Sequence, residues 1–129
     1  MKISDAEWKI MHVVWELGEV SGNDVIERVV PETEWNPQTV RTLLTRLVEK
    51  KILASEKRKG IVYYTPLVSR EESLRVHGQS FLERVFAGNA KELFIHFVRD
   101  GHFSEEMIDE LRKELDHQTQ NKNRRNNDD

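Results

Sequence analysis

Apolar residues recur every three to four positions in the first third of the chain, the spacing of one buried helix face. A first helix is predicted over residues 5–17, because Ser4 and Glu7 match a capping box directly before the apolar series. A second helix of about ten residues begins at Ser21 and stops at Pro31, which cannot continue a helix. The pattern therefore predicts two short amphipathic helices in this part of the chain.

A third helix has the clearest start signal in the sequence. Asn36 can cap free backbone N–H groups, and Pro37 fits the first helical position because its missing donor would be unpaired there. The helix is expected to run to about Lys51 and to divide its side chains between two faces. The apolar stripe consists of Val40, Leu43, Leu44 and Leu47, and the polar face of Gln38, Arg41, Thr42, Thr45, Arg46 and Glu49.

Two β-prone runs follow, at residues 52–56 and 61–65, with a basic segment between them. The segment Lys57-Arg58-Lys59-Gly60 suits a hairpin turn, since glycine accepts the positive φ that such turns need. Three helices and a hairpin of this kind make a winged helix-turn-helix, which we assign to residues 1–67. The hairpin would be its wing.

The second half of the chain carries three further helical patterns. One begins at Ser69 and runs through Phe86, the next spans residues 90–99, and the last begins at Ser104. Alone they could not bury their apolar stripes, so a second copy of the chain is expected to cover them. We therefore predict a mainly α protein with a small β-hairpin wing, in which residues 68–117 form a three-helix dimerisation domain. The predicted dimer interface consists of Phe81, Val85, Leu93, Phe94, Phe97, Ile108, Leu111 and Leu115.

The C-terminal end differs in composition from these helices. Residues 118–129 contain no apolar side chain, so they cannot bury apolar surface to offset the entropy lost on ordering. The sequence therefore predicts a disordered polar tail over residues 118–129.

Composition excludes several classes of protein. A chain of 129 residues fits one domain, or a small domain with an appendage. Its longest apolar runs are far shorter than the roughly 20 residues that cross a bilayer. The N-terminus lacks the apolar region of a secretory signal, so a cytoplasmic location without membrane insertion is expected. Because the chain has no cysteine, disulfide frameworks, thiolate nucleophiles and thiolate metal sites are excluded.

Charge is distributed unevenly along the chain. The net charge is −3, but residues 1–35 carry −5, residues 36–66 carry +5 and residues 67–129 carry −3. A positive segment in an acidic protein is expected where one face meets a polyanion, although a solvated basic face gives the same pattern. The third helix and the wing both lie inside the positive segment.

The residue types on this segment suit DNA recognition. In a helix-turn-helix, the second helix of the pair enters the major groove, and a wing touches the DNA backbone. Arginine can bond guanine or clamp phosphate, glutamine can pair with adenine, and threonine offers a hydroxyl and a methyl group. The candidate DNA contacts are Gln38, Thr39, Arg41, Thr42, Thr45, Arg46 and Lys50, with Lys57, Arg58 and Lys59 on the wing. The alternatives are a winged-helix module that docks an acidic protein and a regulator that responds to a small molecule.

No catalytic, cofactor or metal motif accompanies this pattern. The five histidines show neither an i, i+4 pair nor the HExxH motif of a metal site. Glycine-rich phosphate loops and a GxSxG nucleophile elbow are also missing. The sequence therefore predicts a protein that is not an enzyme and that needs no cofactor or metal.

Two segments of the chain resemble a known family. The first is Ser4-x-Ala6-Glu7-Trp8, and the second, more specific one is WNPQTVRTLLTRL at residues 35–47. Both are similar to the BlaI/MecI family of penicillinase-type repressors, and the similarity covers about residues 3–117. This resemblance implies a homodimeric repressor, with an N-terminal winged helix and a C-terminal dimerisation domain, bound to a palindromic operator in double-stranded DNA.

The resemblance also implies how repression ends. In the β-lactam branch, linked to antibiotic resistance, it implies a cut in the dimerisation domain that is triggered by a membrane sensor-protease. That family is cut between Asn and Phe, and the matching bond here joins His96 and Phe97. A non-proteolytic signal is the alternative. The copper-responsive branch uses a C-terminal cysteine motif, which this chain lacks.

Overall fold

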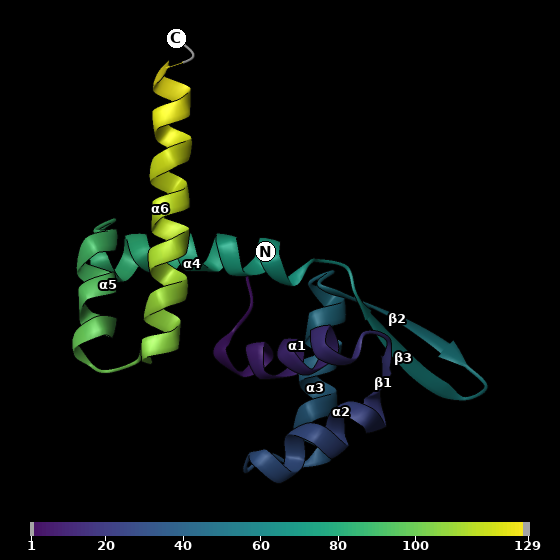
Figure 1. Ribbon diagram of the computed structural model, residues 1–129. Helices are drawn as coiled ribbons and strands as arrows, with labels where there is room; N and C mark the ends of the chain where they lie inside the picture. Colours follow the sequence, from purple (N-terminus) through teal and green to yellow (C-terminus); the bar gives the residue numbers. More distant parts are fainter. Residues whose placement is uncertain (1, 128–129) are drawn as a thin grey trace. The chain divides into compact units, whose positions relative to one another are not determined.

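The computed structural model describes residues 2–127, and the chain forms two compact units, Met1–His77 and Gly78–Asp129 (Figure 1). The N-terminal unit contains three α-helices, one short 3-10 helix, a small sheet and the start of a fourth α-helix. These elements are α1 (Asp5–Leu17), β1 (Val20–Ser21), α2 (Gly22–Val29), η1 (Val30–Glu32), α3 (Pro37–Glu49), β2 (Leu53–Arg58), β3 (Ile61–Pro66) and α4 (Arg70–Phe86).

The helix starts predicted from the sequence are confirmed by side-chain caps. The Ser4 hydroxyl accepts a hydrogen bond from the Glu7 backbone N–H at 3.2 Å, and the Glu7 carboxylate accepts one from the Ser4 backbone N–H at 2.9 Å. Ser21 and Asp24 form the same reciprocal pair at the start of α2. Asn36 caps α3, whose first residue is a proline. Each cap satisfies N–H groups that a helix start leaves unpaired.

The core of the N-terminal unit lies between α1, α2 and α3, which pack against one another. Ile10 of α1, Val25 of α2 and Leu44 and Leu47 of α3 are fully buried. Burial of such a side chain contributes about 1.5–3 kcal/mol. Because the apolar stripe of α3 faces this core, the polar face of the same helix points outward.

The sheet has three antiparallel strands in the order β1-β3-β2, so the wing is anchored by a strand that the sequence did not predict. Strand β1 is only two residues long, too short to show a two-residue alternation. The predicted four-residue turn was wrong, because β2 extends to Arg58 and only two residues connect the strands. Lys59 and Gly60 have φ of 52° and 80°, as a type I′ turn requires.

The first unit extends beyond the boundary predicted at residue 67. The Trp15 indole N–H donates to the Val68 carbonyl at 3.0 Å, and the His77 ring packs edge-on against Trp8 at 5.0 Å between centroids. Ser73, between them, is fully buried. These contacts with α1 attach the first turns of α4 to the winged helix, and the unit therefore ends at His77.

The C-terminal unit contains the rest of α4, α5 (Ala90–Arg99) and α6 (Glu105–Asn127). Asn89 caps α5, and the Ser104 hydroxyl accepts from the Met107 N–H at the start of α6. Within residues 78–126, no side chain is fully buried in the single chain. None of the helices in residues 2–127 is long and apolar enough to cross a membrane.

The structure corrects the predicted tail, because α6 continues as a helix through Asn127. Residues 118–127 contain no glycine or proline to stop a helix. The Gln118 amide donates to Glu114 at 3.3 Å, and the Thr119 hydroxyl donates to the Leu115 carbonyl at 3.0 Å. Two arginines in the last turn favour the helix dipole. A polar composition therefore did not prevent helix formation here, and residues 128–129 of the predicted tail lie outside the described residues.

Candidate nucleic-acid interface

Helix α3 presents one continuous polar face to solvent. Gln38, Arg41, Thr42, Thr45 and Arg46 are all exposed, while Val40 and the three leucines of the helix are buried. The structure therefore brings five of the predicted DNA contacts together on one side of one helix. Thr39, a sixth, is half-buried and serves the helix start, since its backbone N–H and its hydroxyl both donate to the Asn36 side-chain carbonyl.

The two exposed threonines on this face are held by the helix itself. The Thr42 hydroxyl donates to the Gln38 carbonyl, and the Thr45 hydroxyl donates to the Arg41 carbonyl, each at 3.0 Å. Their hydroxyl hydrogens are thus used within the helix, and what remains is a hydroxyl oxygen that accepts and a methyl group. Such side chains suit an apolar contact with a thymine methyl group or acceptance of a hydrogen bond from a base.

The two arginines of the face are free to bind an outside partner. Neither Arg41 nor Arg46 forms an ion pair with any carboxylate in residues 2–127. Arg41 also lies near the wing strand β3: burial raises the pKa of the Tyr64 hydroxyl, and the charge of Arg41 opposes that rise. Arginine in this state can bond guanine bidentately or clamp a phosphate.

The three cations of the wing occupy different positions. Lys57 lies opposite Val62 and Arg58 opposite Ile61, so their side chains project from opposite faces of the hairpin. Lys59 is at the turn. Arg58 is held by the Glu19 carboxylate, and its guanidinium lies 4.2 Å from the centroid of the Tyr63 ring.

Sequence reasoning missed these two partners of Arg58. The alternation of strand β3 places Tyr63 on the face of Arg58, so that contact could have been found from the register. The pairing with Glu19 depends on β1, and no local pattern indicated that strand.

Lys50, another predicted DNA contact, instead contacts α1 and the residues before it. Its ammonium group donates to the Glu7 carboxylate at 2.5 Å and to the Lys2 carbonyl at 3.2 Å. Glu7 is only 1% exposed, so this ion pair links the end of α3 to the buried start of α1. Lys50 therefore positions α3, and it is not part of the exposed face just described.

The ion pair of the buried Glu7 carboxylate should stabilise the fold at neutral pH and lose this effect in acid. Burial would raise its pKa, but the hydrogen bonds from Lys50 and Ser4 outweigh burial and lower the pKa below its ordinary value. The contribution is therefore complete above the ordinary pKa and is lost as pH falls through the lowered one. Glu7→Gln should cost about 1–3 kcal/mol at pH 7 and less in acid, as urea unfolding can measure.

Glu16→Gln is the matched control for this variant. Glu16 pairs with Arg28 at 2.9 Å, but the pair is exposed, so its loss should cost less than about 1 kcal/mol. Equal losses in the two variants at pH 7 would refute a special role for the buried carboxyl.

The sequence of this chain matches that of a known protein family over most of its length. The sequence pattern of the family described as penicillinase repressor matches residues 3–117. This chain belongs to the penicillinase repressor family. Two relatives support the assignment. The methicillin resistance regulatory protein MecI of Staphylococcus aureus (strain N315) is 33% identical over 114 residues, covering 88% of this chain and 93% of MecI. The penicillinase repressor of Bacillus licheniformis is 32% identical over 124 residues, covering 96% of this chain and 94% of the relative.

A solved structure of the same family resembles the N-terminal unit. It is the solution structure of the Bacillus licheniformis BlaI monomeric form in complex with the blaP half-operator. The TM-score is 0.50 at 33% identity, and the match covers 56% of this chain and 88% of that one. The winged helix-turn-helix predicted from the sequence is confirmed.

In this penicillinase-repressor chain, four of the eight predicted interface residues line one hollow. Phe94, Ile108, Leu111 and Leu115 line an apolar hollow of about 310 Å³ between α5 and α6. Phe81, Val85, Leu93 and Phe97 are outside that lining. Even so, Phe97 is 40% exposed and Leu115 57% exposed in the single chain. The C-terminal helices thus leave much apolar surface uncovered.

The predicted cleavage bond lies inside a helix. The His96 and Phe97 carbonyls accept hydrogen bonds from the Asp100 and His102 N–H groups at 3.0 Å and 3.2 Å. A protease that binds an extended substrate could reach this bond only after α5 opens locally. Cleavage between His96 and Phe97 stays a prediction.

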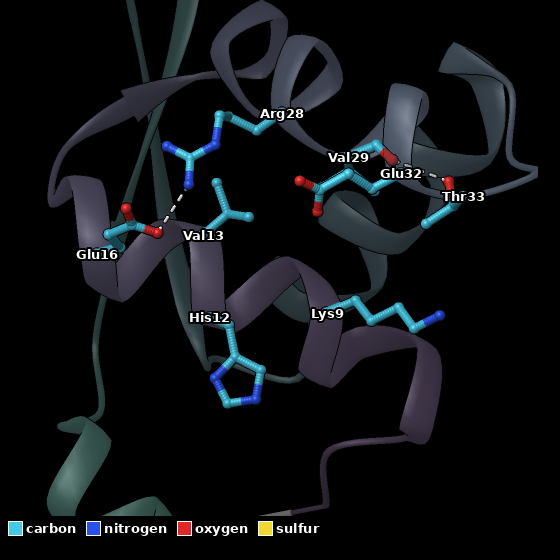
Figure 2. Close-up of a pocket in the computed structure, with 8 residues that line it drawn as sticks. All are labelled: Lys9, His12, Val13, Glu16, Arg28, Val29, Glu32 and Thr33. Carbon is cyan, nitrogen blue, oxygen red and sulfur yellow. Dashed lines mark hydrogen bonds and ion pairs between the residues drawn. The ribbon is translucent and has the colours of Figure 1, made fainter.

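The pocket between α1 and the α2–η1 segment has a different character from the α3 face. Figure 2 shows Glu16 and Arg28 pointing toward each other across it, joined by their ion pair. Its lining mixes cations and anions, with Lys9 and Arg28 beside Glu16 and Glu32, around about 340 Å³. Such a lining gives no net attraction for a polyanion, unlike the exposed face of α3.

Proposed function

We propose that this protein is a transcriptional repressor that binds operator DNA with α3 in the major groove. The observation that carries the proposal is the outward face of α3, where two threonines stand beside two arginines that pair with no carboxylate of the described residues. Family membership supports it, since MecI is named a methicillin resistance regulatory protein and BlaI has been solved with a half-operator. The arginines would read guanine or hold phosphate, and the threonines would contact thymine methyl groups.

The wing has a separate task in this proposal. Lys57 and Lys59 touch the phosphates beside the groove, which fixes position without reading sequence. The α3 face supplies the discrimination between sequences, and the wing adds affinity for any duplex. This division follows from chemistry, because Lys57 and Lys59 carry flexible point charges, whereas the arginines of α3 offer planar, directed donors.

This division of labour makes a measurable prediction. Lys57→Ala and Lys59→Ala should each weaken binding to all duplexes alike and reduce the slope of log K against log salt by about 0.9. The slope is measured by fluorescence anisotropy between about 50 and 200 mM salt, with operator and scrambled duplexes. Lys113→Ala, on α6, is the control and should leave the slope unchanged. If neither wing variant changes the slope, the wing does not contact phosphate.

The same titration tests the proposed function as a whole. A sequence-reading repressor keeps its operator bound in the presence of excess scrambled duplex, whereas a module that docks an acidic protein shows no preference among duplexes. If excess scrambled duplex displaced all of the bound operator, the proposal would be contradicted. The DNA upstream of the protein's own gene is the first duplex to use.

The proposal extends to a homodimer held by the C-terminal unit. The apolar hollow between α5 and α6 and the exposed phenylalanines would be covered by the same surface of a second copy. The two N-terminal winged-helix units would then bind half-sites about one helical turn apart, or a multiple of it, in a palindromic operator. Affinity for the operator would depend on residues that never touch DNA, because linking two winged-helix units raises the effective concentration of the second unit once the first is bound.

A further inference from the structure

Glu19 is an acidic residue beside the basic end of the wing, where Lys57, Arg58 and Lys59 lie; the wing's own acidic residue, Glu56, is on β2 opposite Tyr63. It lies between Gly18, which ends α1, and the short strand β1. Its carboxylate accepts a hydrogen bond from the Arg58 guanidinium at the end of β2. Both side chains are about half exposed, at 47% for Glu19 and 46% for Arg58, so the ion pair is open to solvent and to ligands.

Arg58 is also fixed by an aromatic contact. Its guanidinium lies 4.2 Å from the centroid of the Tyr63 ring, a residue of β3 that pairs with Ser21 of β1. Stacking of this kind orients the guanidinium plane and leaves its edges available for charged partners. Glu19, Arg58, Lys59 and Tyr63 line the same open hollow on the wing. The hollow thus contains two cations and one anion.

The other two wing cations lack such a partner. Within residues 2–127, no ion pair is formed by Lys57 or Lys59. Arg58 is therefore the one wing cation in the described chain whose charge is already neutralised. A DNA phosphate that approaches Arg58 must either displace the Glu19 carboxylate or remain near it and be repelled by its negative charge.

We propose that Glu19 sets the strength and the salt dependence of the wing's contact with DNA by competing with phosphate for Arg58. This inference rests on the proposed function, since it assumes that the wing meets DNA. When Arg58 moves from Glu19 to a phosphate, one ion pair is exchanged for another, and the freed carboxylate retains a cation near the DNA. The exchange therefore releases fewer counterions than a free arginine would release.

Removing the charge of Glu19 tests the inference. Glu19→Gln should strengthen binding to any duplex about twofold to fivefold, the range of an exposed ion pair. It should also steepen the salt slope by about 0.9, as for one added phosphate contact. Affinity is measured by fluorescence anisotropy on operator and scrambled duplexes over a range of KCl concentrations, with thermal unfolding of each variant recorded alongside.

Glu16→Gln is a closely matched control. Glu16 also pairs with an arginine, is also exposed, and changes the net charge by the same amount, but its partner Arg28 lies on α2 at the pocket of Figure 2. Any effect of overall charge appears in both variants. The specific effect is the difference between them, and it should vanish when both changes are repeated in an Arg58→Gln background.

The outcomes separate this inference from the proposed function. A wild-type protein that binds no duplex overturns the proposed function. If the wild type binds DNA but Glu19→Gln and Glu16→Gln behave alike, the competition is refuted and the proposed function stands. Weaker binding by Glu19→Gln would also refute it, since Glu19 would then orient Arg58 toward DNA. A gain that persists in the Arg58→Gln background would exclude Arg58 as the group involved.

Discussion

Arg46→Ala is expected to weaken binding to the operator by about 1–3 kcal/mol, or roughly 5-fold to 150-fold, with little change in thermal stability. Arg46 is exposed on α3 and has no carboxylate partner in residues 2–127, so its removal breaks no ion pair of the folded chain. The loss should be greater for the operator than for a scrambled duplex, because a base contact is sequence-specific whereas a phosphate contact is not. Anisotropy titrations on the two duplexes measure this difference.

Arg28→Ala provides the control for Arg46→Ala. Arg28 is an exposed arginine of the same unit, but it lies on α2 and pairs with Glu16. Its loss removes one positive charge without touching the α3 face. Equal losses of operator affinity in both variants would assign the effect to net charge and would remove Arg46 from the reading face.

Leu111→Glu is expected to separate the proposed dimer into monomers. Leu111 lies in the apolar hollow between α5 and α6, and in a dimer the new carboxylate would be buried without a partner. An unpaired buried charge costs several kcal/mol, enough to separate subunits at micromolar concentrations. Analytical ultracentrifugation should show a monomer, and binding to the full operator should fall toward that of a single half-site.

Leu67→Glu is the matched control for that change. Leu67 follows β3 in the N-terminal unit and is 57% exposed, so a glutamate there meets solvent. This variant should remain dimeric and should bind the operator as the wild type does. A Leu111→Glu protein that is folded, dimeric and tight-binding would place the subunit contact elsewhere.

The parts of the fold that could be predicted are those whose signals are local. The caps at Ser4, Ser21 and Asn36 each involve residues three positions apart, so the starts of α1, α2 and α3 were readable from the sequence. The outward face of α3 followed from the position of its leucines. These features need only the residues of one helix.

The features that were missed join residues far apart in the chain. Lys50 matched the basic composition of the α3 segment, but its ammonium group contacts Glu7, which lies 43 residues away. Strand β1 forms only by pairing with β3, and its two residues carry no pattern of their own. The pairing of Arg58 with Glu19 depends on that strand. The residues of the candidate site could therefore be predicted from the sequence. Which of its cations already pair with a carboxylate of the same chain could not.

Selection of binding sites from a pool of random duplexes tests the central claim most directly. The purified full-length protein is incubated with the pool in the presence of competitor DNA, and the retained duplexes are sequenced. We expect enrichment of an inverted repeat whose half-sites lie about one helical turn apart, or a multiple of it, and Arg46→Ala should lose preference at a defined base of each half-site. Retention without any enriched sequence would contradict the claim that α3 of this protein reads an operator.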